Sequence, residues 1–509
     1  MDADYLIVGS GLSALVFGAL SAKAGSKVLV LEAHEYPGGF GHTFPMGKRY
    51  KFNAQLHYVW NCGEGQTVNR VLKKLELEKQ VTFESFDANG FDHMRMPGYA
   101  LDIPYDADLL VSRLAALFPS HANNCAAFID EVWRTAHGLE ALSSSEAHTQ
   151  IIRNIGKTVS ALKNMQCTLQ EVFDRHQLPQ EAQTLLALQW PDFLLPPNQL
   201  SFYAWVLLFT GYQKGAYYPT RHYEHVINSL VKTIENNGGE IIYNQQVDNF
   251  ILNKKSVVAV EAKDLLSGET KRYQGKRTIC NMDPKKAAAI IGMEKFSSLL
   301  RKRLDYPYSP SNFMAYCVVK DIDLQDYGFG KWNIFHAGSR DLNAAFDAMY
   351  KQHDYSALSF AISTPGFLTS DSSDRPQGQQ IIEFLTVADY SYFKQLKATD
   401  KRAYRRKKNE ILDAMILTVE ENYVPDFRKH LAFKVTGSPT TNERFCWCPQ
   451  GNSYGSSMTP GNFNLGRLNH NSSLKNFYFC NASSGYAGFA GTFWTGAKLY
   501  QRLSGDRIL

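Results

Sequence analysis

Two glycines and one acidic residue near the start of the chain have the types and spacing that bind an adenine dinucleotide. Gly9 and Gly11 stand between an apolar segment, Tyr5–Val8, and a small apolar segment that begins at Leu12. Gly9 permits a tight turn, and Gly11 lets the backbone approach a pyrophosphate whose charge meets the N-terminus of the next helix. Glu32 follows at the distance where a carboxylate binds both ribose hydroxyls and disfavours a 2′-phosphate. The combination predicts a dinucleotide site.

The residues around this site predict the strand, helix and strand that it requires. Residues 5–8 are expected to form a buried strand, residues 12–24 a helix, and residues 27–31 a second strand parallel to the first. Ala14 is small enough for the helix to pack closely on these strands. The fold class predicted from this start is α/β, with a Rossmann-type domain.

The rest of the chain is expected to add a second domain and then return to the first. Residues 67–180 are mostly helical in pattern, and a helix follows Pro219. Residues 240–280 are expected to form a small sheet. An apolar strand at 477–480 leads through several glycines into a helix at 492–503, so both ends of the chain are expected to meet at one ligand.

The composition excludes several classes of protein. The chain has 509 residues, of which 44% are hydrophobic and 20% are charged, so it is expected to be globular with more than one domain. A net charge of +5 is too small for a nucleic-acid-binding face. The eight cysteines are expected to be reduced, because no secretory leader precedes the first strand. The longest apolar run, Phe202 to Thr210, is too short to cross a bilayer, so we expect a cytoplasmic protein whose membrane contact is peripheral.

A second glycine pair, Gly38 and Gly39, follows Glu32 closely. It could bring the chain near the same pyrophosphate, or it could be an ordinary turn, and spacing alone leaves both open. No second dinucleotide fingerprint follows, so a separate NAD(P)H domain is not predicted.

Several segments together resemble the phytoene desaturase, carotenoid isomerase and retinol saturase superfamily, with retinol saturase the nearest likeness. They run in order through nearly the whole chain: EAHEYPGGFGHT at 32–43, residues 55–58 with 63–65, KGAYYP at 214–219, GSPTTN at 437–442, and residues 485–496. The resemblance implies an FAD-binding domain of amine-oxidase topology with an interleaved α+β substrate domain. The FAD domain would comprise residues 1–66, 210–300 and 434–509, and the substrate domain, with its helical insertion, residues 67–209 and 301–433.

The resemblance also implies which residues hold the FAD. Val247 would lie on the adenosine side, and Gly488 and Gly491 would approach the phosphate and the flavin ring. The remaining contacts implied by the likeness are Gly9, Gly11, Glu32, Gly38, Gly39, His42 and Thr43. Family members saturate, desaturate or isomerise double bonds of long apolar polyenes, such as retinoids and carotenoids, with the flavin as electron carrier.

The chain departs from the family pattern at three places. Residues 220–222 (TRH) stand behind Tyr218-Pro219, where many relatives have two glycines. Asn481 replaces a common glycine, and Phe40 replaces an arginine of the desaturase-type members. These departures bear on the substrate and the direction of the reaction more than on the cofactor.

Three side chains are candidate proton donors for flavin chemistry: Tyr218, His57 and His222. Each could instead be a hydrogen-bonded core residue. His222 and His225 are three residues apart, but no carboxylate pattern accompanies them, so no metal site is expected.

The candidate substrate contacts are Arg221, Trp190 and Phe193. Arg221 could hold the acidic head group of a lipid, or it could be a surface residue at a helix start. Trp190 and Phe193 begin an apolar, aromatic segment, 190–210, that could line a long tunnel or fill the core.

The sequence leaves three functions open. The first is saturation or isomerisation of a long apolar alkene, with an unknown electron donor or acceptor; the second is amine-oxidase-like oxidation of a C–N bond; the third is a non-catalytic binding subunit that holds FAD. The basic run KRAYRRKK at 401–408 could steer the protein to an anionic membrane, or it could be a solvated helix face.

Overall fold

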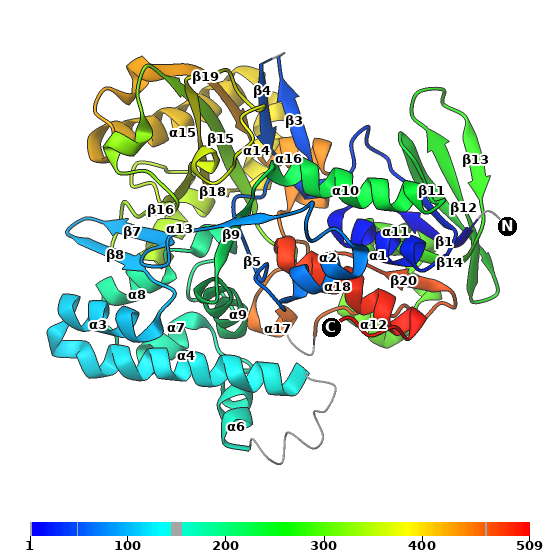
Figure 1. Ribbon diagram of the computed structural model, residues 1–509, viewed down its shortest axis with the longest axis horizontal. Helices are drawn as coiled ribbons and strands as arrows, with labels where there is room; N and C mark the ends of the chain where they lie inside the picture. The colour runs from blue at the N-terminus through cyan, green and yellow to red at the C-terminus, as the bar shows by residue number, and fades with distance from the viewer. Residues whose placement is uncertain (1–2, 48, 144–154, 464–465) are drawn as a thin grey trace.

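The computed structural model describes residues 3–47, 49–143, 155–463 and 466–509. Two large sheets organise the molecule, one at each end of its long axis (Figure 1). A five-stranded parallel sheet at one end carries the dinucleotide fingerprint, and a seven-stranded mixed sheet forms the other end.

The five-stranded sheet draws its strands from three distant parts of the chain. Its order is β10-β2-β1-β14-β20, and every neighbouring pair is parallel. Its strands β1 and β2 are short, mainly apolar runs that are almost entirely buried, as parallel strands are. The strands are β1 (Ala3–Val8), β2 (Val28–Leu31), β10 (Glu240–Ile242), β14 (Gly275–Cys280) and β20 (Phe477–Phe479).

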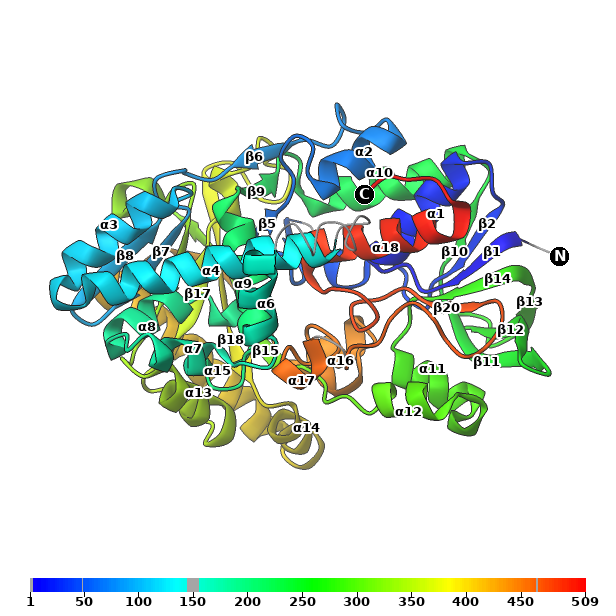
Figure 2. The same cartoon turned by 90° about the horizontal axis from the view of Figure 1, so that it is seen from below.

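Each face of this sheet has a different cover. Tyr5 and Ile7 of β1 point into the main hydrophobic core, whereas Leu6 and Val8 point into a second core on the opposite face. Three helices lie side by side over the first face, namely α1 (Leu12–Lys23), α10 (His222–Asn236) and α18 (Gly488–Ser504) (Figure 2). The predicted strand–helix–strand unit and α/β class are therefore confirmed, and α18 begins four residues before its predicted start.

The opposite face is covered by a small antiparallel sheet and by α11 (Pro284–Ile291). This sheet contains β11 (Gln245–Asn253), β12 (Ser256–Asp264) and β13 (Thr270–Tyr273). The prediction of one small sheet from residues 240–280 was partly wrong, because β10 and β14 at its two ends belong to the parallel sheet. These two strands are short and apolar, and only the completed fold shows which sheet they join.

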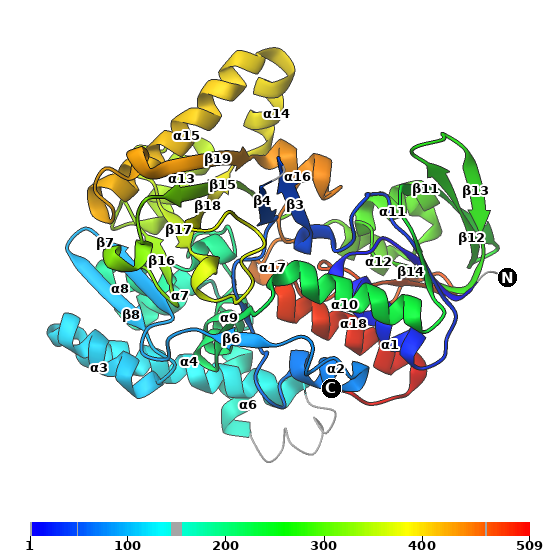
Figure 3. The same ribbon diagram turned by 45° about the horizontal axis from the view of Figure 1, so that its top comes forward.

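The seven-stranded sheet has the order β19-β15-β18-β17-β16-β7-β8. All its pairs are antiparallel except β16 with β7. Two helices flank β19 at its edge, α14 (Tyr390–Thr399) and α15 (Lys401–Asn422) (Figure 3). The strands are β7 (Asp92–Met96), β8 (Tyr99–Ile103), β15 (Ser311–Lys320), β16 (Asn333–His336), β17 (Phe360–Ser363), β18 (Gln379–Ala388) and β19 (Leu431–Gly437).

The expectation that residues 67–180 are mostly helical needs one correction. The hairpin β7–β8, closed by Pro97 and Gly98, lies within this range and extends the seven-stranded sheet. The Pro-Gly pair was the available turn signal for this hairpin, and the helical prediction overlooked it. The helices that follow form a layer beneath the sheet and comprise α3 (Ala107–Leu117), α4 (Ala122–Ser143), α6 (Ile155–Asn164), α7 (Leu169–Arg175), α8 (Gln180–Ala187) and α9 (Phe202–Gln213).

The division into domains at residues 66, 210, 300 and 434 stays a prediction. Helix α2 (Thr67–Leu75) packs against α1 and α18, on the nucleotide-binding side of the first proposed boundary. All eight cysteines are free thiols. Within the four described ranges, no helix has the length and apolar character needed to span a bilayer.

Candidate functional site

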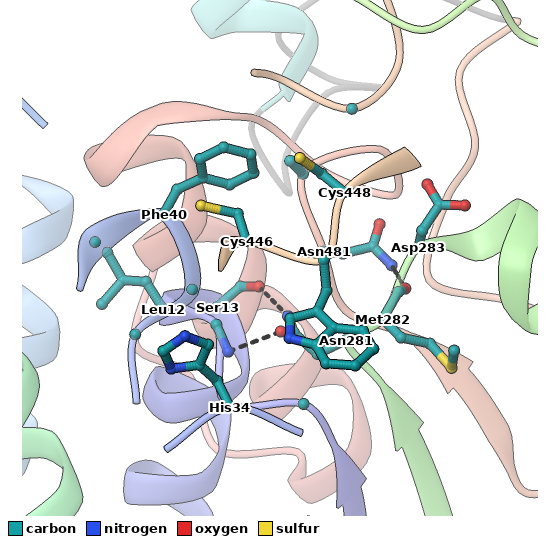
Figure 4. A pocket seen from close by; sticks show the side chains of 18 of the residues that line it. Leu12, Ser13, His34, Phe40, Asn281, Met282, Asp283, Cys446, Cys448 and Asn481 are labelled. Carbon is teal, nitrogen blue, oxygen red and sulfur yellow. Dashed lines mark hydrogen bonds between the residues drawn. The ribbon is translucent and has the colours of Figure 1, made fainter. Parts of the chain in front are cut away.

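A cavity of about 260 Å³ at the nucleotide-binding end opens where the parallel strands end (Figure 4). Val8, Leu31 and the residues after β14 line it together with the first turn of α1. Ligands of open α/β sheets bind at this edge, outside the carboxyl ends of the strands. The position supports a dinucleotide ligand.

The glycine loop at the base of this cavity has the conformation that the fingerprint predicts. Gly9 has φ +94°, a left-handed value that L side chains rarely adopt. The Gly11 N–H donates to Asn281 Oδ1 at 2.8 Å, so it already faces an oxygen acceptor from across the cavity. A Cβ on Gly11 would lie 2.5 Å from that oxygen. The loop therefore fits a close-approaching oxyanion such as a phosphate.

Glu32 is held in place by backbone donors. Its Oε2 accepts from the Ser10 N–H and from the Ser10 hydroxyl, both at 2.6 Å, and its Oε1 accepts from the His34 N–H at 2.8 Å. The carboxylate is buried yet lines the cavity. This fixed acceptor at the end of β2 is suited to ribose hydroxyls.

The second glycine pair lies directly against the first. The Gly38 N–H donates to Ser10 O at 2.9 Å, and Gly38 forms an isolated bridge with Gly11. Gly39 has φ +57°, and a Cβ there would lie 3.2 Å from Gly11 Cα. Of the two interpretations left open by the sequence, the structure favours close approach to the same ligand.

Eight of the predicted cofactor residues line one cavity, and three do not. Ala14 is buried in the helix–strand packing that was predicted for it, Thr43 lines a separate cavity, and Gly491 packs against Tyr486. Contact of Thr43 and Gly491 with a cofactor stays a prediction. The eight that line the cavity are Gly9, Gly11, Glu32, Gly38, Gly39, His42, Val247 and Gly488.

The sequence did not identify two cavity-lining segments, residues 281–286 and 445–455. Asn281 follows β14, the neighbour of β1, and donates through Nδ2 to Ser13 Oγ at 3.0 Å. Asp283 lies next to it, and burial raises the pKa of its carboxyl group. Two polar residues directly after a strand, Asn281 and Asp283, were the available signal.

Two departures from the family pattern, Phe40 and Asn481, lie in the cavity wall (Figure 4). The Asn481 side chain donates to Met282 O at 3.1 Å and accepts from the Ser484 N–H at 3.0 Å. Asn481 therefore ties the C-terminal segment to the loop after β14, where a glycine would leave this contact unmade.

The candidate proton donors form two separate pairs. Tyr218 and His222 lie 3.2 Å apart at a hydrogen-bonding distance, and burial raises the pKa of Tyr218 well above its usual range. His57 Nδ1 lies 3.1 Å from Glu383 Oε2. Their role in catalysis stays a prediction.

The candidate substrate contacts are dispersed. Arg221 lines a small cavity together with the acidic residues Asp371 and Asp374, which disfavour a negatively charged ligand. Trp190 and Phe193 are 2% and 1% exposed and lie in the main core, as the core interpretation predicts. Their contact with substrate stays a prediction.

The two histidines considered for a metal face different partners. His222 Nε2 lies 2.8 Å from Asp371 O, and His225 Nε2 lies 2.9 Å from Gln80 O. In the part of the chain that the structure describes, no group of three or more His, Cys, Asp or Glu side chains could hold a metal ion.

Comparison with known proteins shows which proteins this chain is similar to. A family model described as an NAD(P)-binding Rossmann-like domain matches residues 7–75. The chain is 21% identical to all-trans-retinol 13,14-reductase of Danio rerio, over 97% of this chain and 85% of that protein. It is 22% identical to the chloroplastic prolycopene isomerase of Arabidopsis thaliana, over 87% of this chain and 72% of that protein.

The solved structures agree on the fold. Putrescine oxidase bound to putrescine superposes with a TM-score of 0.65 at 12% identity, over 99% of this chain and 100% of that one. This likeness confirms the predicted amine-oxidase topology. Since enzymes of retinol and of prolycopene match along most of its length, the chain is similar to members of the phytoene desaturase, carotenoid isomerase and retinol saturase superfamily.

Proposed function

We propose that this protein is an FAD-dependent oxidoreductase that saturates or isomerises a carbon–carbon double bond of a long apolar lipid or polyene. The observation that supports this most is the extent of one cavity. It is lined by Glu32, at the end of β2, and also by Leu56 and Tyr454, which pack against the main hydrophobic core. We call the part lined by Leu56 and Tyr454 the inner end of the cavity. A bound cofactor would place its ribose at Glu32 and carry out its chemistry at the inner end.

The residues present fit FAD. Gly9, Gly11 and Gly38 would hold the pyrophosphate, and Glu32 would hold the adenosine ribose. FAD supplies the transfer of a hydride or of electrons when it is bound. The chain itself has to orient the substrate, exclude water and move a proton.

The substrate class is proposed from the relatives. Their names specify all-trans-retinol and prolycopene, and both are long conjugated molecules. The inner end of the cavity adjoins a large apolar and aromatic core, which includes Phe209 and Phe335. This environment suits a polyene better than a charged amine.

The test uses purified protein loaded with FAD and reduced anaerobically with dithionite. We expect all-trans-retinol to gain two hydrogen atoms, or prolycopene to change its double-bond geometry at constant mass, as measured by chromatography with mass detection. A panel of amines in air, with peroxide measured, is run in parallel. Peroxide release without polyene turnover would favour C–N oxidation, and a bound flavin inert to every donor and acceptor would favour a binding subunit.

A further inference from the structure

A buried acidic cluster lies beside the inner end of the cofactor cavity. The Tyr58 hydroxyl lies 3.1 Å from Asp92 Oδ2 and 2.8 Å from Asp192 Oδ2. Asp92 also accepts from Gln189 Nε2 at 2.5 Å and from Asn333 Nδ2 at 3.1 Å. Asp92 is fully buried, and the cluster is assembled from β7, β16, the segment before β5 (Val59–Trp60) and the turn Trp190–Asp192.

The hydrogen atoms in this cluster can be counted. A phenol carries one hydrogen, so Tyr58 can donate to Asp92 or to Asp192 but not to both. If both carboxyl groups were ionised, one of the two short oxygen–oxygen contacts would have no hydrogen in it. One carboxyl group must therefore carry a proton.

The hydrogen-bond donors around Asp92 and Asp192 indicate which of these two carboxyl groups carries the proton. Asp92 faces three donors, from Tyr58, Gln189 and Asn333, and this suits an ionised carboxylate. Asp192 has one contact in the cluster, with Tyr58, and is the better place for an acid hydrogen. Burial raises the pKa of Asp92 to about 7, and burial together with the Asp92 charge raises the pKa of Asp192 well above its usual range.

Asp192 also borders a small enclosed cavity. The cavity volume is about 10 Å³, which is about the space of one water molecule. Its polar lining is formed by His57, Tyr58, Asp192, Asn333, Ser363 and Glu383. One water there would lie between the acidic cluster and the His57–Glu383 pair.

His57 and Asp192 are each adjacent in sequence to a residue that lines the cofactor cavity or contacts a residue that lines it. Leu56, which lines that cavity, precedes His57, and the hydroxyl of cavity-lining Tyr454 donates to Pro191 O at 3.4 Å. His57 Nε2 is buried and has no hydrogen-bond partner among the described residues. Its other nitrogen is oriented by Glu383.

We propose that Asp92, Tyr58 and Asp192 form a proton store for the double-bond reaction, with His57 as the residue through which the proton passes. The inference rests on the proposed function. In saturation, bound FAD in its reduced form would supply the hydride for one alkene carbon, and Asp192 would supply the proton for the C–H bond at the other. Asp192 would then be a carboxylate that accepts the Tyr58 hydrogen.

The store can be refilled from solvent through Glu383. Glu383 lines both the one-water cavity and a second cavity that contains His222, Lys51 and Glu224. The Lys51 and Glu224 side chains are each 42% exposed. Protons can therefore reach Glu383 from the surface and pass by way of His57 to Asp192.

The first experiment asks whether the store holds a proton. Infrared spectra of FAD-loaded protein at neutral pH should contain a protonated-carboxyl band that shifts in D2O. We expect Asp192→Asn to remove this band and the exposed control Asp248→Asn to leave it. A band unchanged by Asp192→Asn, or absent from the wild type, overturns the store.

The second experiment asks whether the proton is used. With reduced protein and all-trans-retinol, we expect Asp192→Asn and Tyr58→Phe to slow turnover by about 100-fold, with flavin absorbance unchanged. The wild-type rate should fall as pH rises through the pKa of the store, and Asp92→Asn should move this fall to lower pH by removing a neighbouring charge. Besides Asp92, the titratable groups facing Asp192 are Tyr58, Tyr212, Tyr454, His57 and Glu383.

The two proposals fail in different ways. If Asp192→Asn keeps the wild-type rate and pH profile on a polyene, the proton-store proposal is wrong and the proposed function stands. If the wild type turns over no polyene, the proposed function fails, and delivery of the proton to a double bond fails with it.

Discussion

The buried carboxylates at the two ends of the molecule are held in different ways. Glu32, beside the five-stranded sheet, accepts hydrogen bonds from the backbone of Ser10 and His34, which are 22 and 2 residues away. Asp92, in the seven-stranded sheet, accepts from side chains of Tyr58, Gln189 and Asn333, which are 34, 97 and 241 residues away. The first carboxylate is fixed by a local motif, and the second by the assembled tertiary structure.

Because their hydrogen-bond donors differ, the Glu32 site is suited to binding a ligand and the Asp92 site is able to hold a proton. Glu32 has donors on both oxygens and stays a fixed acceptor for an incoming ligand. Asp92 shares Tyr58 with a second acid, and this sharing forces a proton into the cluster. Changing one acid at each end should therefore affect different properties of the protein.

The largest expected effect is on stability, from Asp92→Ala. It leaves two buried donors without their acceptor, on Gln189 and Asn333, while Tyr58 can still donate to Asp192, so the free energy of unfolding should fall by about 3 kcal/mol. Denaturant unfolding measures this. The matched control is Asp102→Ala, whose side chain is 40% exposed and pairs with Arg95, and which should lose less than about 1 kcal/mol. Equal losses would contradict the assignment of Asp92 to a buried cluster.

The next effect is on cofactor affinity, from Glu32→Ala. Loss of two hydrogen bonds to a charged acceptor costs about 1.5 kcal/mol each, so FAD affinity should fall by about 100-fold. Fluorescence titration of the apoprotein with FAD measures this. The exposed neighbour Glu35→Ala should bind as the wild type does. If Glu32→Ala binds FAD normally, the ribose is held elsewhere.

The contrast between local contacts and contacts that are distant in sequence also explains how much of the fold could be predicted. The strand, turn and helix around Gly9 follow from residues adjacent in sequence, and their bounds were predicted to within two residues. The strand β14 has the same apolar character, but its place beside β1 depends on a contact about 270 residues away in the chain. Local pattern identifies such a strand and leaves its sheet unspecified.

The candidate site also contains some residues that are close in sequence and others that only the tertiary structure brings together. Six of the eight predicted cofactor residues that line the cavity converge because they lie within one short segment, residues 9–42. Asn281 and residues 445–455 reach the cavity from distant loops and have no comparable signal in sequence. Asp92 and Asp192 were missed because an isolated acid in a sequence resembles a surface residue, and only the folded chain buries them together.

Two buried histidines, one at each end of the molecule, allow the pH dependence of stability to be compared between the two ends. Burial lowers the pKa of both His336 and His470 from 6.5 to about 4. The unfolded chain binds more protons between these values, so stability should fall as pH drops from 6.5 to 4, by about 3 kcal/mol for each residue. Denaturant unfolding across this range should show a shallower slope in His336→Gln and in His470→Gln, and no change in the exposed control His137→Gln. A shallower slope in only one variant would indicate that the two ends unfold separately.

The smallest effect on stability is expected from the basic run on α15. Arg406 pairs with Asp400 and Lys407 with Glu410, and Lys408 donates to Thr436 O, so half of the six cations have partners within the fold. The other three, Lys401, Arg402 and Arg405, are exposed. Changing these three to Gln should alter the free energy of unfolding by less than about 0.5 kcal/mol.

The informative measurement on the same triple variant is sedimentation with anionic vesicles. Each cation near an anionic surface contributes about 1 kcal/mol, so a membrane-facing run would lose binding by roughly 100-fold in the triple variant. A matched variant, Lys271, Arg272 and Lys276 changed to Gln, removes three cations at the opposite end of the molecule. If both variants bind vesicles equally, the run is a solvated helix face, and any approach to a membrane-held lipid involves another surface.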